Sequence, residues 1–215
     1  MFEIITAGGW LMLPILTCSV VAMAIVAERC WVLRQNRILP SNLANQARRW
    51  LIDDGIPDEK IRLLQNNSPL GRILAAGLAN RHLPREKIKN SVEEVGSHVA
   101  HELQRFLNAL GTIATITPLL GLLGTVIGMI SVFTRITSAG VGNPTELAGG
   151  ISTALITTAA GLAVAIPSLM MYRYFRGRIE TLVVDMEQES LKLIDAIESA
   201  LNARSGNNQP AGNLR

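Results

Sequence analysis

The chain has 215 residues, of which 48% are hydrophobic and 17% are charged, below the ~25% of charged residues that is usual in a soluble domain. The formal net charge is only +3, with both signs present, so the charge does not indicate nucleic-acid binding. This composition argues against an ordinary soluble domain and fits a small membrane protein with several spans.

The N-terminal region contains a charge-free stretch, 4–27, that is long enough to cross a bilayer as a helix. A cleaved signal peptide is the alternative interpretation. The residue before the stretch is Glu3, where a signal peptide carries Lys or Arg, and no small-residue cleavage site precedes the positive charges that begin at Arg29. We therefore expect 4–27 to be a retained transmembrane helix.

Residues 28–105 are predicted to be a helical region interrupted by three breaks that combine proline with polar residues. A longer helix begins near Pro84, and we expect it to continue without interruption into the second span. The region is too short and too charged for a large core of its own, so we expect extensions of the spans that pack together. The predicted short helices are 42–51, 58–64 and 70–81.

Two further charge-free stretches, 106–134 and 147–172, are separated by a loop expected over 135–146. Both are long enough to span a bilayer, yet they are rich in Gly, Ala, Ser and Thr. Small residues let helices approach closely in lipid, where the solvent provides no hydrophobic force for association. We therefore predict that one face of each stretch packs against another helix. The glycines expected at this contact are Gly121, Gly124, Gly128 and Gly161.

Thr125 and Thr158 lie beside these small-residue faces, at similar predicted depths of ~13–17 Å from the outer edge of the bilayer. Two hydroxyl groups at one level near mid-membrane can line a polar pore. The alternative is that each hydroxyl bonds the carbonyl four residues earlier in its own helix and only assists packing. No Asp, Glu, Lys or His lies inside any of the three stretches, so a carboxylate for proton transfer would have to come from a partner chain.

The distribution of basic residues predicts the orientation of the spans. None precedes the first stretch, 13 lie between the first and second, one lies in 135–146 and six follow Tyr172. By the positive-inside rule, the N-terminus and the short loop are outside, while 28–105 and the tail are cytoplasmic. The tail is expected to be helical over 173–204, with an apolar stripe, and disordered over 205–215. Three arginines are expected to mark the cytoplasmic edge of the third span and to contact anionic lipid head groups: Arg173, Arg176 and Arg178.

No sequence motif indicates an enzyme, a cofactor or a metal centre. The chain lacks a P-loop, a GxSxG motif, an HExxH motif and a CxxC pair. His98 and His101, near Glu94 and Glu102, have a helical spacing that can hold a metal. Two histidines without other ligands more often belong to a solvated helix face, so we expect neither a metal nor a cofactor.

The segments TPLLGLLGTVIGM, residues 117–129, and GISTALITTAAGLAVAIP, residues 150–167, resemble the two signature helices of the MotA/TolQ/ExbB proton channel family, and of its ExbB/TolQ branch in particular. The resemblance implies an all-α membrane protein with three transmembrane helices and long cytoplasmic helical extensions, assembled as a pentameric ring in the bacterial inner membrane. It also implies two ExbD/TolR-like single-span partner chains inside the ring, whose Asp carries the proton, and a link to a TonB- or TolA-like protein.

By motif position, Thr125 and Thr158 match the pore-lining threonines of the family, and Thr153 and Thr157 belong to the same expected polar path. Thr153 is also a departure, since many ExbB and TolQ proteins have Glu at this position. The predicted function is a proton-channel and motor subunit that uses the proton motive force for periplasmic or outer-membrane work. The alternative is a non-conducting helical membrane scaffold whose small residues serve only packing. The energised process stays open between TonB-linked uptake, Tol-type envelope function and export.

Overall fold

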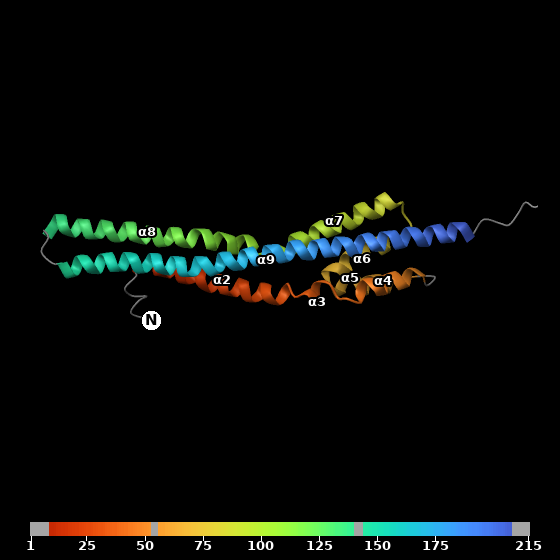
Figure 1. Ribbon diagram of the computed structural model, residues 1–215, viewed down its shortest axis with the longest axis horizontal. Coiled ribbons are helices and arrows are strands. Elements are labelled where there is room, and N and C mark those ends of the chain that lie inside the picture. The colour runs from red at the N-terminus through yellow and green to blue at the C-terminus, as the bar shows by residue number, and fades with distance from the viewer. Residues whose placement is uncertain (1–8, 53–55, 140–143, 208–215) are drawn as a thin grey trace, which may run out of the picture. The chain divides into compact units, whose positions relative to one another are not determined.

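The computed structural model describes residues 9–52, 56–139 and 144–207, and every regular element in these ranges is an α-helix (Figure 1). This confirms the expected all-α class. The chain divides into two compact units. The apolar unit consists of Met1–Cys30 and Phe106–Arg176, and the charged unit consists of Trp31–Arg105 and Gly177–Arg215.

Three helical segments of the described residues are long and apolar enough to cross a membrane, in agreement with the predicted number of spans. They belong to α2 (Met12–Val32), α8 (Leu107–Ala139) and α9 (Pro144–Asn207). Large apolar side chains lie on their outward faces: Val20 is 70% exposed, Leu122 56% and Leu155 63%. Lipid or neighbouring protein is the environment that such surfaces require.

The boundaries of the spans differ from the expected ones. Gly9 has φ +71°, a left-handed conformation that favours glycine, and α2 starts only at Met12, while residues 1–8 lie outside the described residues. α8 and α9 both extend into the loop expected over 135–146. Residues 135–139 and 144–146 of the expected loop are therefore helical, and residues 140–143 lie outside the described residues.

The charged unit is built around α6 (Pro69–Ala79), an apolar helix of 11 residues of which seven are buried. Ser68 caps its start by accepting a hydrogen bond from the Gly71 backbone N–H at 3.1 Å. Pro69 follows in the first turn, where a helix needs no N–H donor. The helices that pack against α6 are α3 (Gln35–Ile38), α4 (Leu43–Ile52), α5 (Asp58–Asn67) and α7 (Arg85–Leu103).

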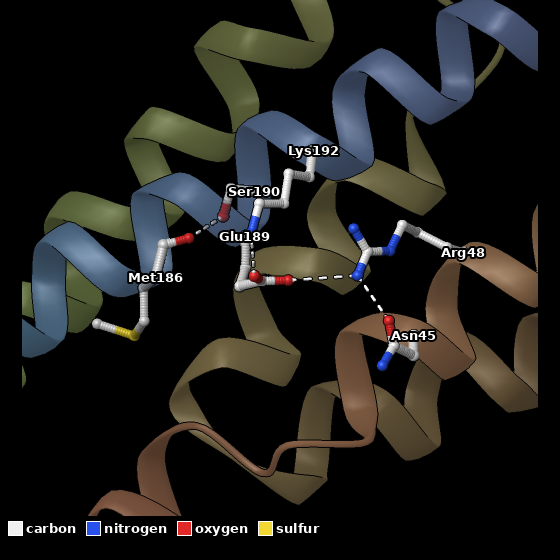
Figure 2. Close-up of polar contacts among 6 residues, drawn as sticks. All are labelled: Asn45, Arg48, Met186, Glu189, Ser190 and Lys192. Carbon is white, nitrogen blue, oxygen red and sulfur yellow. Dashed lines mark hydrogen bonds and ion pairs between the residues drawn. The ribbon is translucent and has the colours of Figure 1, made fainter.

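The part of α9 in the charged unit buries the apolar stripe that its helical spacing predicts. Its other faces carry charged residues, and Figure 2 shows one of them, Glu189, beside Arg48 of α4. The Arg48 guanidinium donates to Asn45 Oδ1 at 2.7 Å and lies 3.6 Å from Glu189 Oε2, while Lys192 Nζ lies 2.7 Å from Glu189 Oε1. Partly exposed ion pairs of this kind contribute little to stability, so the stripe is the main contact. Its members, each at most 2% exposed, are Ile179, Leu182, Met186, Leu193, Ile194 and Ile197.

A second set of ion pairs joins α7 to α9 inside the charged unit. Arg85 donates to Asp195 Oδ1 at 2.8 Å and also pairs with Glu198. Hydrogen bonds to these two carboxylates raise the pKa of Arg85 above its ordinary value, as expected for a cation beside two anions.

The single helix expected from Pro84 into the second span is wrong, because α7 ends at Leu103 and α8 begins at Leu107. Phe106 between them has φ +63°, a left-handed conformation that is costly for a bulky side chain. No glycine or proline marks this break in the sequence. The Arg29 guanidinium lies 5.6 Å from the centre of the Phe106 ring, a cation–π contact that contributes roughly 0.5–2 kcal/mol and so helps to hold the break.

The C-terminal boundary also differs from the expected one. α9 is one continuous helix of 64 residues that ends at Asn207, so disorder does not begin at Ser205 as predicted. The expected disorder over 208–215 lies outside the described residues. Continuity of α9 agrees with the expectation that the tail prolongs the third span.

Candidate functional site

Two glycines lie where the backbones of α8 and α9 touch. A Cβ added at Gly161 would lie 2.7 Å from the backbone oxygen of Thr117, and one added at Gly121 would lie 2.9 Å from Thr158 Cα. Cβ atoms do not approach other heavy atoms this closely, so hydrogen is the only side chain that permits this packing. The two helices therefore meet backbone to backbone near the middle of their apolar segments.

The next two glycines along α8 face side chains of α9. A Cβ added at Gly124 would lie 2.5 Å from Thr157 Cγ2, and one added at Gly128 would lie 2.8 Å from Ala154 Cβ. The small-residue face predicted for α8 is thus directed at α9 of the same chain. Sequence spacing alone did not say which helix it would contact.

Most threonines near this contact donate to a carbonyl of their own helix, as hydroxyl groups commonly do where water is scarce. Thr117, Thr153 and Thr157 donate to the carbonyl four residues earlier, at 2.5, 3.0 and 2.8 Å. Thr125 donates to the Leu122 carbonyl, three residues earlier, at 2.7 Å. In each of these bonds the hydroxyl proton is donated within the residue's own helix.

Thr158 behaves differently from these neighbours. Its hydroxyl donates to the backbone carbonyl of Gly121 on α8, at 2.8 Å, across the helix contact. The alternative that Thr158 bonds the carbonyl four residues earlier is therefore wrong. The short approach at Gly121 explains the difference, because it brings that carbonyl within reach of the hydroxyl.

The expected path residues differ in exposure. Thr125, Thr153 and Thr158 are partly exposed, whereas Thr157 is only 1% exposed and its methyl group packs against Gly124. Thr157 therefore contributes to the packing of α8 against α9, and its expected place on a polar path stays a prediction.

Thr153 lines a cavity of about 210 Å³ within the apolar unit, together with Thr157, Ser131 and Arg135. Hydroxyl oxygens in such a cavity can accept hydrogen bonds from water. Three residues that directly precede α2 form another part of its wall, and no sequence pattern indicated this role. They are Gly9, Trp10 and Leu11.

His98 and His101 are exposed on α7. Throughout the ranges that the structure describes, no group of three or more His, Cys, Asp or Glu residues is arranged to hold a metal ion. The exposure of both histidines fits the solvated helix face.

The arginines after the third span fall on both sides of the boundary between the two units. Arg173 and Arg176 are exposed in the apolar unit, next to Tyr172, whose ring packs against Gly111. Arg178 belongs to the charged unit and donates to Gln35 Oε1 at 2.9 Å. Arg178 thus has a structural contact within the charged unit.

Residues 65–188, more than half of the chain, match the sequence model of the MotA/TolQ/ExbB proton channel family. The chain belongs to this family. Its relatives include the ExbB-like 1 biopolymer transport protein of Synechocystis sp., which is 31% identical over 197 residues that cover 90% of this chain and 74% of the relative. The ExbB-like 3 protein of the same organism is 32% identical, over 80% of this chain and 82% of the relative.

The Tol-Pal system protein TolQ of Haemophilus influenzae is 31% identical over 61% of this chain and 57% of its own length. Among solved structures, Campylobacter jejuni MotAB superposes with a TM-score of 0.55 at 18% identity, over 86% of this chain and 73% of that one, which supports the fold. The predicted family and its ExbB/TolQ-like branch are confirmed. This member of the MotA/TolQ/ExbB family is an ExbB/TolQ-type energy-transducing membrane subunit, in a family of channel and transport proteins and not of enzymes.

Proposed function

We propose that this chain forms a pentameric ring in the bacterial inner membrane and conducts protons together with two ExbD/TolR-like single-span chains. The ring uses the proton motive force for work in the periplasm or at the outer membrane, through a TonB- or TolA-like protein. Membership of the proton channel family and similarity to ExbB-like and TolQ proteins support this proposal.

The observation that carries the proposal is the position of Thr125 and Thr158. The Thr158 hydroxyl donates to the Gly121 carbonyl, one helical turn (about 5.4 Å) before Thr125, so the two threonines lie about one turn apart along the helix pair. Both side chains are partly exposed on segments without a charged residue. Polar groups at neighbouring depths in an otherwise apolar segment are suited to a narrow polar path.

Proton transfer along this path requires a group that gains and loses a proton near neutral pH. The three charge-free stretches contain no Asp, Glu, Lys or His, and Thr153 supplies only a hydroxyl at the position where the family resemblance implies a Glu. Hydroxyl groups do not titrate in this range. We therefore assign the titrating group to an Asp on the single-span partner, and the threonines to hydrogen bonds with that carboxyl group.

Liposomes that contain the ring without a partner are expected to take up protons no faster than empty liposomes under an imposed potential. A narrow pore lined by hydroxyl and apolar groups excludes a bare ion, because the ion would lose its hydration without compensation. Adding the partner is expected to produce uptake that depends on the potential. Rapid uptake by the ring alone would show that the chain has a complete proton path of its own.

The bonding of the threonine hydroxyls to backbone carbonyls favours a second candidate, a non-conducting helical scaffold. In that case the glycines and threonines serve only the contact between α8 and α9. The same liposome assay separates the two candidates. A scaffold predicts no proton uptake even when the partner is present.

The positive-inside rule predicts the topology, with the N-terminus and the loop after α8 in the periplasm. In a background with Cys18 and Cys30 replaced by serine, a membrane-impermeant maleimide added from the periplasmic side is expected to label Thr137→Cys but not Lys89→Cys. Both positions are exposed, Thr137 near the end of α8 and Lys89 on α7. Labelling of Lys89→Cys alone would invert the topology.

We also propose that Arg173 and Arg176 lie at the cytoplasmic edge of the third span and contact anionic lipid head groups. Their exposure beside the interfacial residue Tyr172 supports this assignment. Arg178 is expected at the same edge, but its hydrogen bond to Gln35 leaves fewer of its donors for lipid.

A further inference from the structure

The hydrogen bond from Thr158 to Gly121 determines what this hydroxyl can offer to a ligand. A threonine hydroxyl has one proton to donate and two lone pairs that accept. The proton of Thr158 is directed at the Gly121 carbonyl at 2.8 Å, between two apolar helical segments. The oxygen atom of this partly exposed side chain therefore keeps only its accepting capacity.

Thr125 has the same restriction for a different reason. Its hydroxyl proton is directed at the Leu122 carbonyl in its own helix, at 2.7 Å. Both threonines assigned to the proton path therefore present an acceptor and not a donor. The two differ in that Thr158 also joins α9 to α8, where a Cβ at Gly121 would lie 2.9 Å from the Thr158 backbone.

We propose that Thr158 and Thr125 act on the path solely as hydrogen-bond acceptors, and that Thr158 is in addition a positioning residue that holds α9 in register with α8. The inference rests on the proposed function, because it assumes that both oxygens face the partner's carboxyl group. The ligand selected at this level is a hydrogen-bond donor. A neutral carboxylic acid or a water molecule can donate a hydrogen bond to the threonine oxygen. An ionised carboxylate is disfavoured, because its oxygens also only accept and would face the threonine oxygen without a proton between them.

This assignment gives the threonines a definite part in proton transfer. The partner's carboxyl group donates its proton to a threonine oxygen while it is neutral, and the threonine bonds to Gly121 and Leu122 stay intact. Ionisation removes that donated hydrogen bond and leaves the carboxylate next to lone pairs. The carboxylate is then favoured only where water or another donor is available, which promotes release of the proton away from this level.

The test uses the ring purified with its single-span partner and a carbodiimide, a reagent that modifies carboxyl groups in their neutral form. The measured quantity is the pH at which labelling of the partner's carboxyl group is half maximal. Thr158→Val and Thr125→Val are each expected to lower this pH by about half a unit or more, because the neutral acid loses an acceptor. Thr158→Ser keeps the hydroxyl and is expected to retain the original value.

Thr181→Val is the matched control, since Thr181 also donates to a carbonyl of α9, that of Gly177 at 3.0 Å, but lies in the charged unit. It is expected to leave the labelling profile unchanged. A rise of the half-maximal pH in Thr158→Val would overturn the inference, because it would show that the hydroxyl donates to the carboxylate, while the placement on the path would stand. An unchanged value in both the Thr125→Val and Thr158→Val proteins would overturn the placement as well.

Discussion

Replacing Gly161 with alanine is expected to destabilise the packing of α8 and α9 by about 1–3 kcal/mol, and Gly161→Leu is expected to prevent assembly of the ring. The added Cβ would lie 2.7 Å from the backbone oxygen of Thr117 and 3.2 Å from Gly121 Cα. Backbone atoms within a helix cannot move aside as a flexible side chain can. Thermal denaturation of the purified protein measures the first effect, and size-exclusion chromatography measures the second.

Gly177→Ala is the matched control for this prediction. Gly177 lies on the same helix, and its added Cβ would meet no atom within 4 Å. Alanine is a better helix former than glycine by about 1 kcal/mol, so this variant is expected to be as stable as the original protein or slightly more stable. A Gly161→Ala protein that melts at the unchanged temperature and forms a ring of normal size would contradict a tight contact at this position.

Thr125→Val and Thr158→Val are each expected to reduce proton-driven activity by roughly ten- to a hundredfold while the ring still assembles. Valine has nearly the shape of threonine but lacks the oxygen atom. A buried carboxyl group that loses its acceptor is destabilised by ~1–3 kcal/mol, which corresponds to that range of rates. The measurements are proton-driven activity in cells that carry only the variant, and the size of the purified complex.

Thr112→Val provides a comparison within α8. Thr112 is exposed and donates to the Asn108 carbonyl at 2.8 Å, so it bonds a carbonyl of its own helix as Thr125 does, but it lies near the start of α8. The activity of the Thr112→Val protein is expected to stay near that of the original protein. Full activity in both the Thr125→Val and Thr158→Val proteins would remove these residues from the proposed proton path.

Features that depend on runs of neighbouring residues could be predicted from the sequence. The number of apolar segments follows from stretches without charge, since any charge there would be costly in lipid. Several helix starts follow from local signals: α5 begins after Pro57, α6 at Pro69 and α7 after Pro84. The family could also be predicted, because its motifs are continuous in the segments 117–129 and 150–167 and can be read without knowing any contact.

Other features depend on which residues meet in space, and no local pattern specifies them. The break at Phe106 has no glycine or proline to mark it, and Arg29, which contacts the Phe106 ring, is 77 positions earlier in the chain. Thr157 and Thr158 are neighbours in the sequence, and spacing alone could not predict that their side chains have different contacts. In the structure, Thr157 packs against Gly124. The Thr158 hydroxyl instead donates to the carbonyl of Gly121, 37 positions earlier. A carbonyl within a helix can accept a second hydrogen bond, and whether a hydroxyl of the other helix reaches it depends on how closely the two helices approach.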